Sequence, residues 1–201
     1  MTVTAAEGRW LAGRAAAAVA AHLAGHPGDG RLPTATGLRA VGATFVTLES
    51  AGALLGCVGT LDAGRPRFLD AMHNAVRATA DPRLPPVTLA QWPGVDVIVS
   101  VLTVPEALPV TGADDVIALL RPGVDGLVLV DAQRRATFLP SVWHKLPHPG
   151  QFVGALLHKG GWAHGQLRSA PVPGDWPPDL TALRYTATEF TDPAPRPPIA
   201  G

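Results

Sequence analysis

The sequence predicts an α+β fold in which helices flank an antiparallel β-sheet. Two pairs of neighbouring apolar segments, each joined by a short polar turn, predict β-hairpins, and Ala-rich or amphipathic segments around them predict helices. Strands and helices do not alternate regularly, as they would in a parallel α/β sheet. The chain has 201 residues, a length that suits one domain or two unequal lobes and that buries roughly 70% of the unfolded surface.

The first predicted element is a helix that begins after Thr4 and ends near Leu23. Thr4 and Glu7 have the spacing of a capping box, in which each side chain accepts a hydrogen bond from a backbone N–H at the start of a helix. Gly25 and Pro27 follow the Ala-rich segment and end it.

The second predicted element is a β-hairpin. Residues 43–48 and 53–58 are apolar and flank the four-residue loop 49–52. Because alternate side chains of a strand point to opposite faces, the second strand should sort its residues into two sets. These sets are Leu55, Cys57 and Gly59 on one face and Leu54 and Val58 on the other.

A helix is predicted over residues 67–80, and Asp81-Pro82 ends it. Its spacing predicts an apolar inner face and a polar outer face. The inner face holds Phe68, Met72, Ala75, Val76 and Thr79, and the outer face holds Asp70, His73, Asn74 and Arg77.

The second half of the chain is predicted to contain one more hairpin and several shorter elements. The expected elements are a strand at 95–102, a helix at 113–120, hairpin strands at 126–130 and 135–139, a helix at 151–158, and an edge strand at 180–188. The proline-rich segment 191–201 is expected to be a disordered tail.

Composition excludes several classes of protein. Sixteen basic and sixteen acidic residues give a formal net charge of zero, whereas a general nucleic-acid binder needs a basic surface. No apolar run reaches the roughly 18 residues that span a bilayer, and the N-terminal residues lack the features of a secretory signal. The chain is therefore expected to be a soluble, cytoplasmic protein without nucleic-acid or membrane partners.

The single cysteine, Cys57, excludes an internal disulfide and any site with several thiolate ligands. Gly56 and Gly59 flank it and would allow a substrate or another backbone to approach the sulfur. Cys57 is thus a candidate nucleophile or a single soft metal ligand. The alternative is a buried structural cysteine, because free cysteines are among the most buried residues.

The histidines do not form a metal-binding pattern, and no metal or cofactor is predicted. His22 and His26, like His144 and His148, are four residues apart, but glycine or proline residues prevent either pair from sharing one helix. His73 is the histidine nearest to Cys57 in the sequence and is the candidate general base for its thiol. A solvated surface histidine is the alternative.

Seven sequence blocks resemble the AMMECR domain family, whose prokaryotic members are called AmmeMemoRadiSam system protein A. The signature block is Leu54-Leu55-Gly56-Cys57-Val58-Gly59-Thr60. The other blocks are residues 45–48, 81–86, 99–102, 121–127, 137–143 and 159–161, and they occur in the order of the family.

The resemblance implies one domain over residues 1–190, with a larger lobe, a smaller lobe and a cleft near the cysteine motif. It supports a functional role for Cys57, with His73 as the candidate base chosen above, and Gly56, Gly59, Asp125 and Lys159 are the candidate residues of the cleft. Asp125 has a simpler explanation, because aspartate in a turn often bonds its own backbone. The family's prokaryotic members are associated with a Memo-like protein and a radical S-adenosylmethionine (SAM) protein.

Two functions remain open at this point. The chain is an enzyme or enzyme subunit that works with those partners in a modification or biosynthetic pathway, or it is a non-catalytic module that presents a substrate or scaffolds them. One departure from the family pattern affects the first hypothesis: Leu55 stands where the family usually has Arg. An Arg beside the thiol could favour its ionised form or hold an anion, and Leu55 can do neither.

Overall fold

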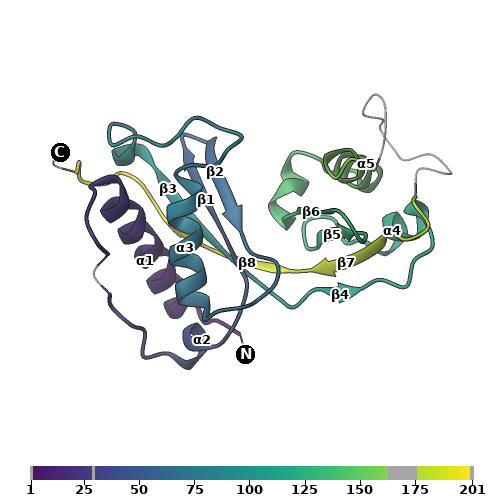
Figure 1. Cartoon of the computed structure of the whole chain (residues 1–201), viewed down its shortest axis with the longest axis horizontal. Coiled ribbons are helices and arrows are strands. Elements are labelled where there is room, and N and C mark those ends of the chain that lie inside the picture. Colours follow the sequence, from purple (N-terminus) through teal and green to yellow (C-terminus); the bar gives the residue numbers. More distant parts are fainter. Residues whose placement is uncertain (1, 29, 163–175, 200–201) are drawn as a thin grey trace. The chain divides into compact units, whose positions relative to one another are not determined.

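The structure, a computed structural model, describes residues 2–28, 30–162 and 176–199 and confirms the α+β class (Figure 1). It divides into two compact units. Unit 1 comprises residues 1–102 and 188–201, and the shorter unit 2 comprises residues 103–187. Each unit contains one four-stranded sheet.

In unit 1 the strand order is β2-β1-β3-β8, and β1 pairs antiparallel with both β2 and β3. Helices α1 and α3 lie side by side and pack against one face of this sheet (Figure 1). The elements are α1 (Ala5–Leu23), α2 (Thr36–Arg39), β1 (Thr44–Ser50), β2 (Ala53–Gly59), α3 (Arg67–Ala78), η1 (Trp92–Gly94), β3 (Asp96–Leu102) and β8 (Ala187–Asp192). The predicted capping box is confirmed, because the Thr4 side chain accepts from the Glu7 N–H and Glu7 accepts from the Thr4 N–H.

In unit 2 the strand order is β4-β7-β5-β6, with antiparallel pairs throughout. Its core is centred on Phe152, whose ring stacks on Trp143 at 3.9 Å between centroids and meets Phe138 edge-on at 5.3 Å. The elements are β4 (Glu106–Ala107), α4 (Ala113–Leu119), β5 (Gly126–Val130), β6 (Arg135–Phe138), η2 (Pro140–His144), α5 (Pro149–Lys159) and β7 (Thr181–Tyr185).

The predicted faces of α3 are partly wrong. Asp70 and Asn74, expected on the polar outer face, are 1% and 0% exposed. Both bond to Thr44 at the start of β1: Asp70 Oδ2 accepts from the Thr44 N–H at 2.9 Å, and Asn74 Nδ2 donates to the Thr44 carbonyl at 3.0 Å. A helix face that meets the end of a strand must satisfy backbone polar groups, so polar residues are buried there.

The first hairpin is confirmed, but its loop is shorter than expected. The strands extend to Ser50 and from Ala53, and the turn consists of Ala51 and Gly52, both with positive φ. This geometry suits a two-residue hairpin turn. A register shift follows, because Leu48 lies opposite Gly56 while Glu49 lies opposite Leu54, which leaves Leu55 as an extra residue.

The bulge corrects the expected faces of β2. Strict alternation would put Leu55 on the same face as Cys57, but Leu55 packs against the apolar core of unit 1, beneath the helices. A residue inserted into a strand interrupts the two-residue period, so alternation counted across it fails.

The structure of residues 180–199 differs from the two predictions made for this part of the chain, an edge strand and a disordered tail. The predicted edge strand at 180–188 is β7, which lies between β4 and β5, and β8 follows it in the sheet of unit 1. The segment predicted to be a disordered tail packs against unit 1 as far as Ile199. The Arg196 N–H donates to the Pro93 carbonyl at 2.9 Å, and Arg196 Nε donates to the Val95 carbonyl at 2.6 Å. A proline-rich segment loses little backbone entropy on docking, so its composition does not prevent order.

Candidate functional site

Cys57 lies on β2, one of the two edge strands of the unit 1 sheet. It is half-buried and lies opposite Thr47, whose hydroxyl donates a hydrogen bond to the sulfur at 3.3 Å. Val46 and Leu48, the neighbours of Thr47 on β1, are fully buried in the core shared with α1 and α3. The Thr47 and Cys57 side chains therefore point to the face of the sheet that these helices do not cover.

The backbone of Cys57 is held by residues of the Asp81-Pro82-Arg83 block, which follows α3. Asp81 Oδ2 accepts from the Cys57 N–H at 3.0 Å, and Arg83 Nη2 donates to the Cys57 carbonyl at 3.0 Å. The two side chains also bond to each other, with Arg83 Nη2 2.6 Å from Asp81 Oδ2. Both backbone polar groups on the outer side of the strand are thus satisfied, and another strand cannot pair with β2 at this residue.

The electrostatics of this pair fix the charge of both partners. Hydrogen bonding from Arg83, followed by the Cys57 and Arg83 backbone N–H groups, holds the pKa of Asp81 far below its ordinary value, although burial opposes this. The pKa of Arg83 is raised, chiefly by its hydrogen bonds to Asp81, and the charge of an ionised Cys57 contributes in the same direction. We refer to Thr47, Cys57, Asp81 and Arg83 as the Cys57 cluster.

The glycines that flank Cys57 are explained by internal packing. A Cβ on Gly56 would lie 2.0 Å from the Ala78 carbonyl oxygen at the end of α3, and a Cβ on Gly59 would lie 2.1 Å from the Phe45 ring. The space that the sequence analysis assigned to a substrate beside Gly56 and Gly59 is therefore filled by the protein itself. The cavity between α1 and α3 is not lined by Gly56, Cys57 or Gly59.

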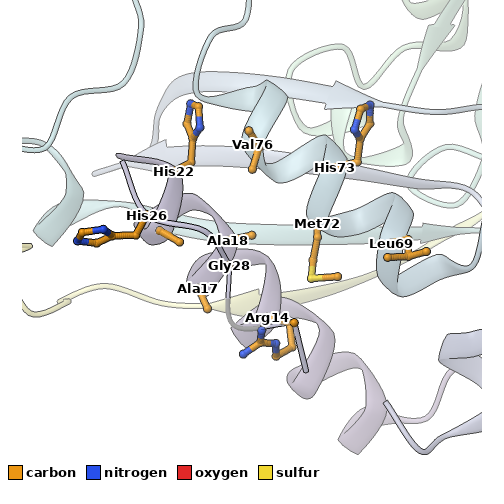
Figure 2. Close-up of a pocket in the computed structure, with 12 residues that line it drawn as sticks. Arg14, Ala17, Ala18, His22, His26, Gly28, Leu69, Met72, His73 and Val76 are labelled. Carbon is orange, nitrogen blue, oxygen red and sulfur yellow. The ribbon is translucent and has the colours of Figure 1, made fainter. Parts of the chain in front are cut away.

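The structure does not place His73 beside the thiol. His73 is exposed on α3 and lines a cavity between α3 and α1 together with His22 (Figure 2). The Cys57 side chain points to the other face of the sheet, so proximity in the sequence misled the assignment of His73 as a base. The cation associated with the cysteine is Arg83, and its signal was present in the sequence as the Asp81-Pro82-Arg83 block.

The other two predicted cleft residues belong to unit 2. Asp125 is fully buried and is bonded by Arg121, through the backbone N–H at 2.9 Å and through Nη2 at 2.6 Å. Lys159, at the end of α5, donates from Nζ to the Thr137 carbonyl at 2.9 Å and lies 5.0 Å from the Phe138 ring centroid. Within unit 2, Asp125 closes the turn before β5, and Lys159 joins α5 to β6.

Sequence analysis missed a second buried polar group, formed by Asp70, Asn74, Thr44 and Thr60. Asp70 Oδ2 accepts from the Thr44 hydroxyl at 2.7 Å and from Asn74 Nδ2 at 3.1 Å, while Asn74 Nδ2 also lies 3.2 Å from the Thr60 hydroxyl. Asp70 Oδ1 makes no hydrogen bond and lies 3.6 Å from Arg65 Nε. These contacts join α3 to the ends of β1 and β2, so we assign the group a structural role.

Two kinds of feature are absent from the residues that the structure describes. Among the described residues, no three histidine, cysteine or acidic side chains come together as metal ligands would. In the same part of the chain, no helix combines the length and apolar composition needed to span a bilayer.

Comparison with known proteins gives consistent results. Residues 13–190 match the family described as AMMECR1. A protein of Methanothermobacter thermautotrophicus is 41% identical over 143 residues, which cover 68% of this chain and 72% of that protein. Protein MJ0810 of Methanocaldococcus jannaschii is 30% identical over 152 residues, covering 71% and 68% of the two chains. The crystal structure of the uncharacterized protein PH0010 from Pyrococcus horikoshii superimposes with a TM-score of 0.85 at 26% identity, over 98% of this chain and 97% of that one.

Proposed function

The chain belongs to the AMMECR1 family, and from this premise we propose that it is an enzyme, or a subunit of one, that uses the Cys57 thiol. The observation that carries the proposal is the hydrogen bond from the Thr47 hydroxyl to the Cys57 sulfur, beside the Arg83 guanidinium that donates to the Cys57 backbone carbonyl. A hydroxyl that donates to sulfur and a nearby guanidinium both favour a thiolate, which is the nucleophilic and metal-binding form of cysteine. The hydrogen bond and the positive charge of the cluster therefore favour ionisation of the Cys57 thiol, which is the role of a histidine base in other cysteine enzymes.

The alkylation rate of Cys57 with iodoacetamide tests this role directly. Because the chain has one cysteine, all added mass in an intact-mass spectrum belongs to Cys57. We expect the folded protein to react faster at pH 7 than the urea-unfolded chain, and Arg83→Gln to slow the folded protein about tenfold. Thr47→Val, which removes the hydroxyl and keeps the volume, should slow it less.

A matched control separates the effect of Arg83 from a general loss of positive charge. Arg77→Gln removes an exposed guanidinium from α3 and should leave the alkylation rate unchanged. Equal rates for Arg83→Gln, Arg77→Gln and the wild type would contradict an activated thiolate. Labelling that occurs only in urea would show that Cys57 is structural.

The pathway context follows the family. We propose that the protein works in the cytoplasm with a Memo-like protein and a radical SAM protein in a modification or biosynthetic pathway. Cys57→Ser should then fold normally and abolish the output of the reconstituted pathway. Full output from the variant would exclude a chemical role for Cys57.

A second function, a non-catalytic module that presents a substrate or scaffolds these partners, is favoured by the packing around Cys57. The protein's own atoms occupy the positions beside Gly56 and Gly59 that a substrate would need. On this hypothesis the purified proteins co-elute in size-exclusion chromatography, and Cys57→Ser leaves the complex intact. Separate elution at micromolar concentrations would count against it.

A further inference from the structure

The chain passes between the two units twice, and the two passages are joined to each other by hydrogen bonds. It leaves unit 1 after Leu102 and returns to it at Thr188. In the first passage residues 103–105 separate β3 from β4, and in the second a single residue, Thr186, separates β7 from β8. The passages are therefore short, and their residues lie outside the strands of both sheets.

The residues that precede each passage are firmly held within their own unit. Leu102 is 5% exposed, and its N–H donates to the Ala43 carbonyl of unit 1 at 3.1 Å. Tyr185 is 2% exposed and lies opposite Gly126 on β5 of unit 2. The Tyr185 hydroxyl donates to the Phe138 carbonyl at 3.1 Å. Each unit thus holds its strand up to the last residue before the passage.

The residues that follow the passages are held in the same way. After the first passage, Glu106 of β4 lies opposite Arg184 of β7 within unit 2. After the second, Phe190 of β8 packs on α1 in unit 1, where a Cβ on Gly8 would lie 2.1 Å from its ring. Only residues 103–105 and Thr186 can therefore change their backbone angles without breaking a β-ladder.

Thr103 and Thr186 are bonded to each other. The Thr103 N–H donates to the Thr186 carbonyl at 2.9 Å, and the Thr186 N–H donates to the Thr103 hydroxyl, also at 2.9 Å. The second bond uses a side chain where a β-ladder would use a backbone carbonyl, so the regular ladder stops here. Val104 is 82% exposed, and Pro105 restricts it to extended conformations. The conformational freedom of the first passage therefore lies mainly at Thr103.

We propose that Thr103 and Thr186 form a hinge about which unit 2 rotates as a rigid body relative to unit 1. Hinges are a few residues at the ends of elements that absorb changes in φ and ψ, while the packed elements on either side keep their structure. Because the two threonines are bonded to each other, their backbone angles change together, and rotation about the pair breaks no bond of either sheet. The hinge does not depend on the function proposed for Cys57.

Double electron–electron resonance between pairs of nitroxide spin labels tests the proposal in the full chain. Cys57→Ser provides a background without cysteine. The inter-unit pair is attached through Arg77→Cys on α3 of unit 1 and Ala118→Cys on α4 of unit 2, both of which replace exposed residues. In one control pair, Arg9→Cys on α1 is combined with Arg77→Cys. In the other, His158→Cys on α5 is combined with Ala118→Cys.

The inter-unit pair should give a distance distribution that is broader by several ångströms than that of either control pair. A rotation of about 15°, the size of a known rigid-body transition, moves a distant label by that much, whereas two labels within one unit keep a fixed separation. Circular dichroism confirms that each labelled chain is folded. An inter-unit distribution as narrow as those of the control pairs would overturn the proposal.

A variant of the hinge locates the motion. Thr103→Val keeps the volume of the side chain and removes the hydroxyl that accepts from the Thr186 N–H. The two passages are then less tightly joined, and the inter-unit distribution should broaden further. Thr188→Val, which changes an exposed threonine of β8, should leave the distribution unchanged. Equal widths for Thr103→Val, Thr188→Val and the unsubstituted labelled chain would show that the units do not rotate about this pair.

Residual dipolar couplings of the wild-type chain give a measurement that needs neither a substitution nor a spin label. The backbone N–H couplings of each unit are fitted to the structure of that unit alone. Two parts of one rigid body share a single alignment tensor, whereas rotation on the microsecond-to-millisecond timescale of hinge motions lowers the degree of order of one unit relative to the other. We expect different degrees of order, and identical tensors for the two units would overturn the proposal.

Discussion

The two units use buried and half-buried aspartates differently. In unit 1, Asp70 accepts from the backbone N–H of Thr44, 26 residues away, and Asp81 accepts from that of Cys57, 24 residues away. In unit 2, Asp125 accepts from the N–H of Arg121, four residues away, and Asp131 accepts from those of Gln133 and Arg134, two and three residues away. In unit 1 both carboxylates thus accept from a backbone N–H of a distant segment, whereas the backbone N–H donors to Asp125 and Asp131 are local. Asp131 also reaches a distant segment through a side chain, because Trp162 Nε1 donates to its Oδ2 at 2.6 Å.

The unit 1 bonds lie within residues 1–102, where they fix α3 and the residues that follow it against β1 and β2. Cys57 of the candidate site is held by one of them directly. Substitutions in such bonds should therefore disturb the candidate site in unit 1, whereas equivalent substitutions in unit 2 should change only stability.

The largest expected effect comes from glycines at close contacts. A Cβ on Gly56 would lie 2.0 Å from a backbone carbonyl of α3, so Gly56→Ala can be accommodated only if the helix moves away from β2. A Cβ on Gly160 would lie 1.9 Å from the Trp162 ring, and a side chain moves more easily than a helix. We expect Gly56→Ala to lower the free energy of unfolding by about 3 kcal/mol or more and Gly160→Ala by about 1–2 kcal/mol.

Urea unfolding followed by circular dichroism measures both values. Gly112→Ala is the control, because a Cβ there meets no atom within 4 Å, and it should change stability little. If Gly160→Ala destabilised the protein more than Gly56→Ala, contacts between distant segments would not be more sensitive to substitution than contacts between near neighbours in the chain.

A smaller effect is expected from the C-terminal segment, which belongs to unit 1 alone. The Arg196 guanidinium lies 4.7 Å from the Trp92 ring centroid, donates to the Val95 carbonyl and pairs with Asp192. Arg196→Ala should cost about 2 kcal/mol of unfolding free energy in unit 1, because it removes charge-assisted bonds and a cation–π contact.

Hydrogen exchange by mass spectrometry resolves where that loss occurs. Faster exchange is expected in α1 and β3 of unit 1, while β5 and α5 of unit 2 keep their protection. Uniformly faster exchange in both units would show that they unfold as one. The difference between the two units would then apply to their hydrogen bonds but not to their stability.

Much of this architecture could be predicted from the sequence. Apolar runs and turn residues located both hairpins and the helices α1, α3, α4 and α5 to within a few residues, whereas the short α2 was not predicted. The ordered blocks identified the family, which is confirmed. These features depend on local periodicity and local composition. The blocks also contained Asp81 and Arg83, although nothing in their spacing showed that they would bond to Cys57.

What the sequence could not show depends on contacts between distant segments. The burial of Asp70 and Asn74 depends on the position of Thr44, and helical periodicity alone assigns polar residues to solvent. The bulge at Leu55 is invisible to alternation, and His73 was chosen by distance along the chain although a sheet separates it from the thiol. The order of the C-terminal segment depends on Trp92 and Val95, about a hundred residues earlier.

A change in stability similar in size to that of Arg196→Ala, and the most specific one, concerns Asp81 and Asp125. Asp81→Asn should cost about 2 kcal/mol at pH 7, because it weakens bonds to a charged acceptor. The pKa of Asp81 in the folded protein lies below its unfolded value of about 3.9. Its contribution is therefore complete above that value and is lost as the pH falls through the lower, folded pKa. The stability difference between wild type and Asp81→Asn should shrink as the pH is lowered from 5 towards 2.

Asp125→Asn provides the matched comparison in unit 2, since Asp125 is equally buried and also paired with an arginine. Both variants should be less stable than wild type at pH 7, but only Asp81→Asn should change the alkylation rate of Cys57. The reason is that Asp81 holds the N–H of Cys57, whereas Asp125 holds the N–H of its own turn. An unchanged rate in Asp81→Asn would mean that the Asp81 and Arg83 contacts fix the edge strand without tuning the thiol. The two units would then use their aspartates for the same structural purpose.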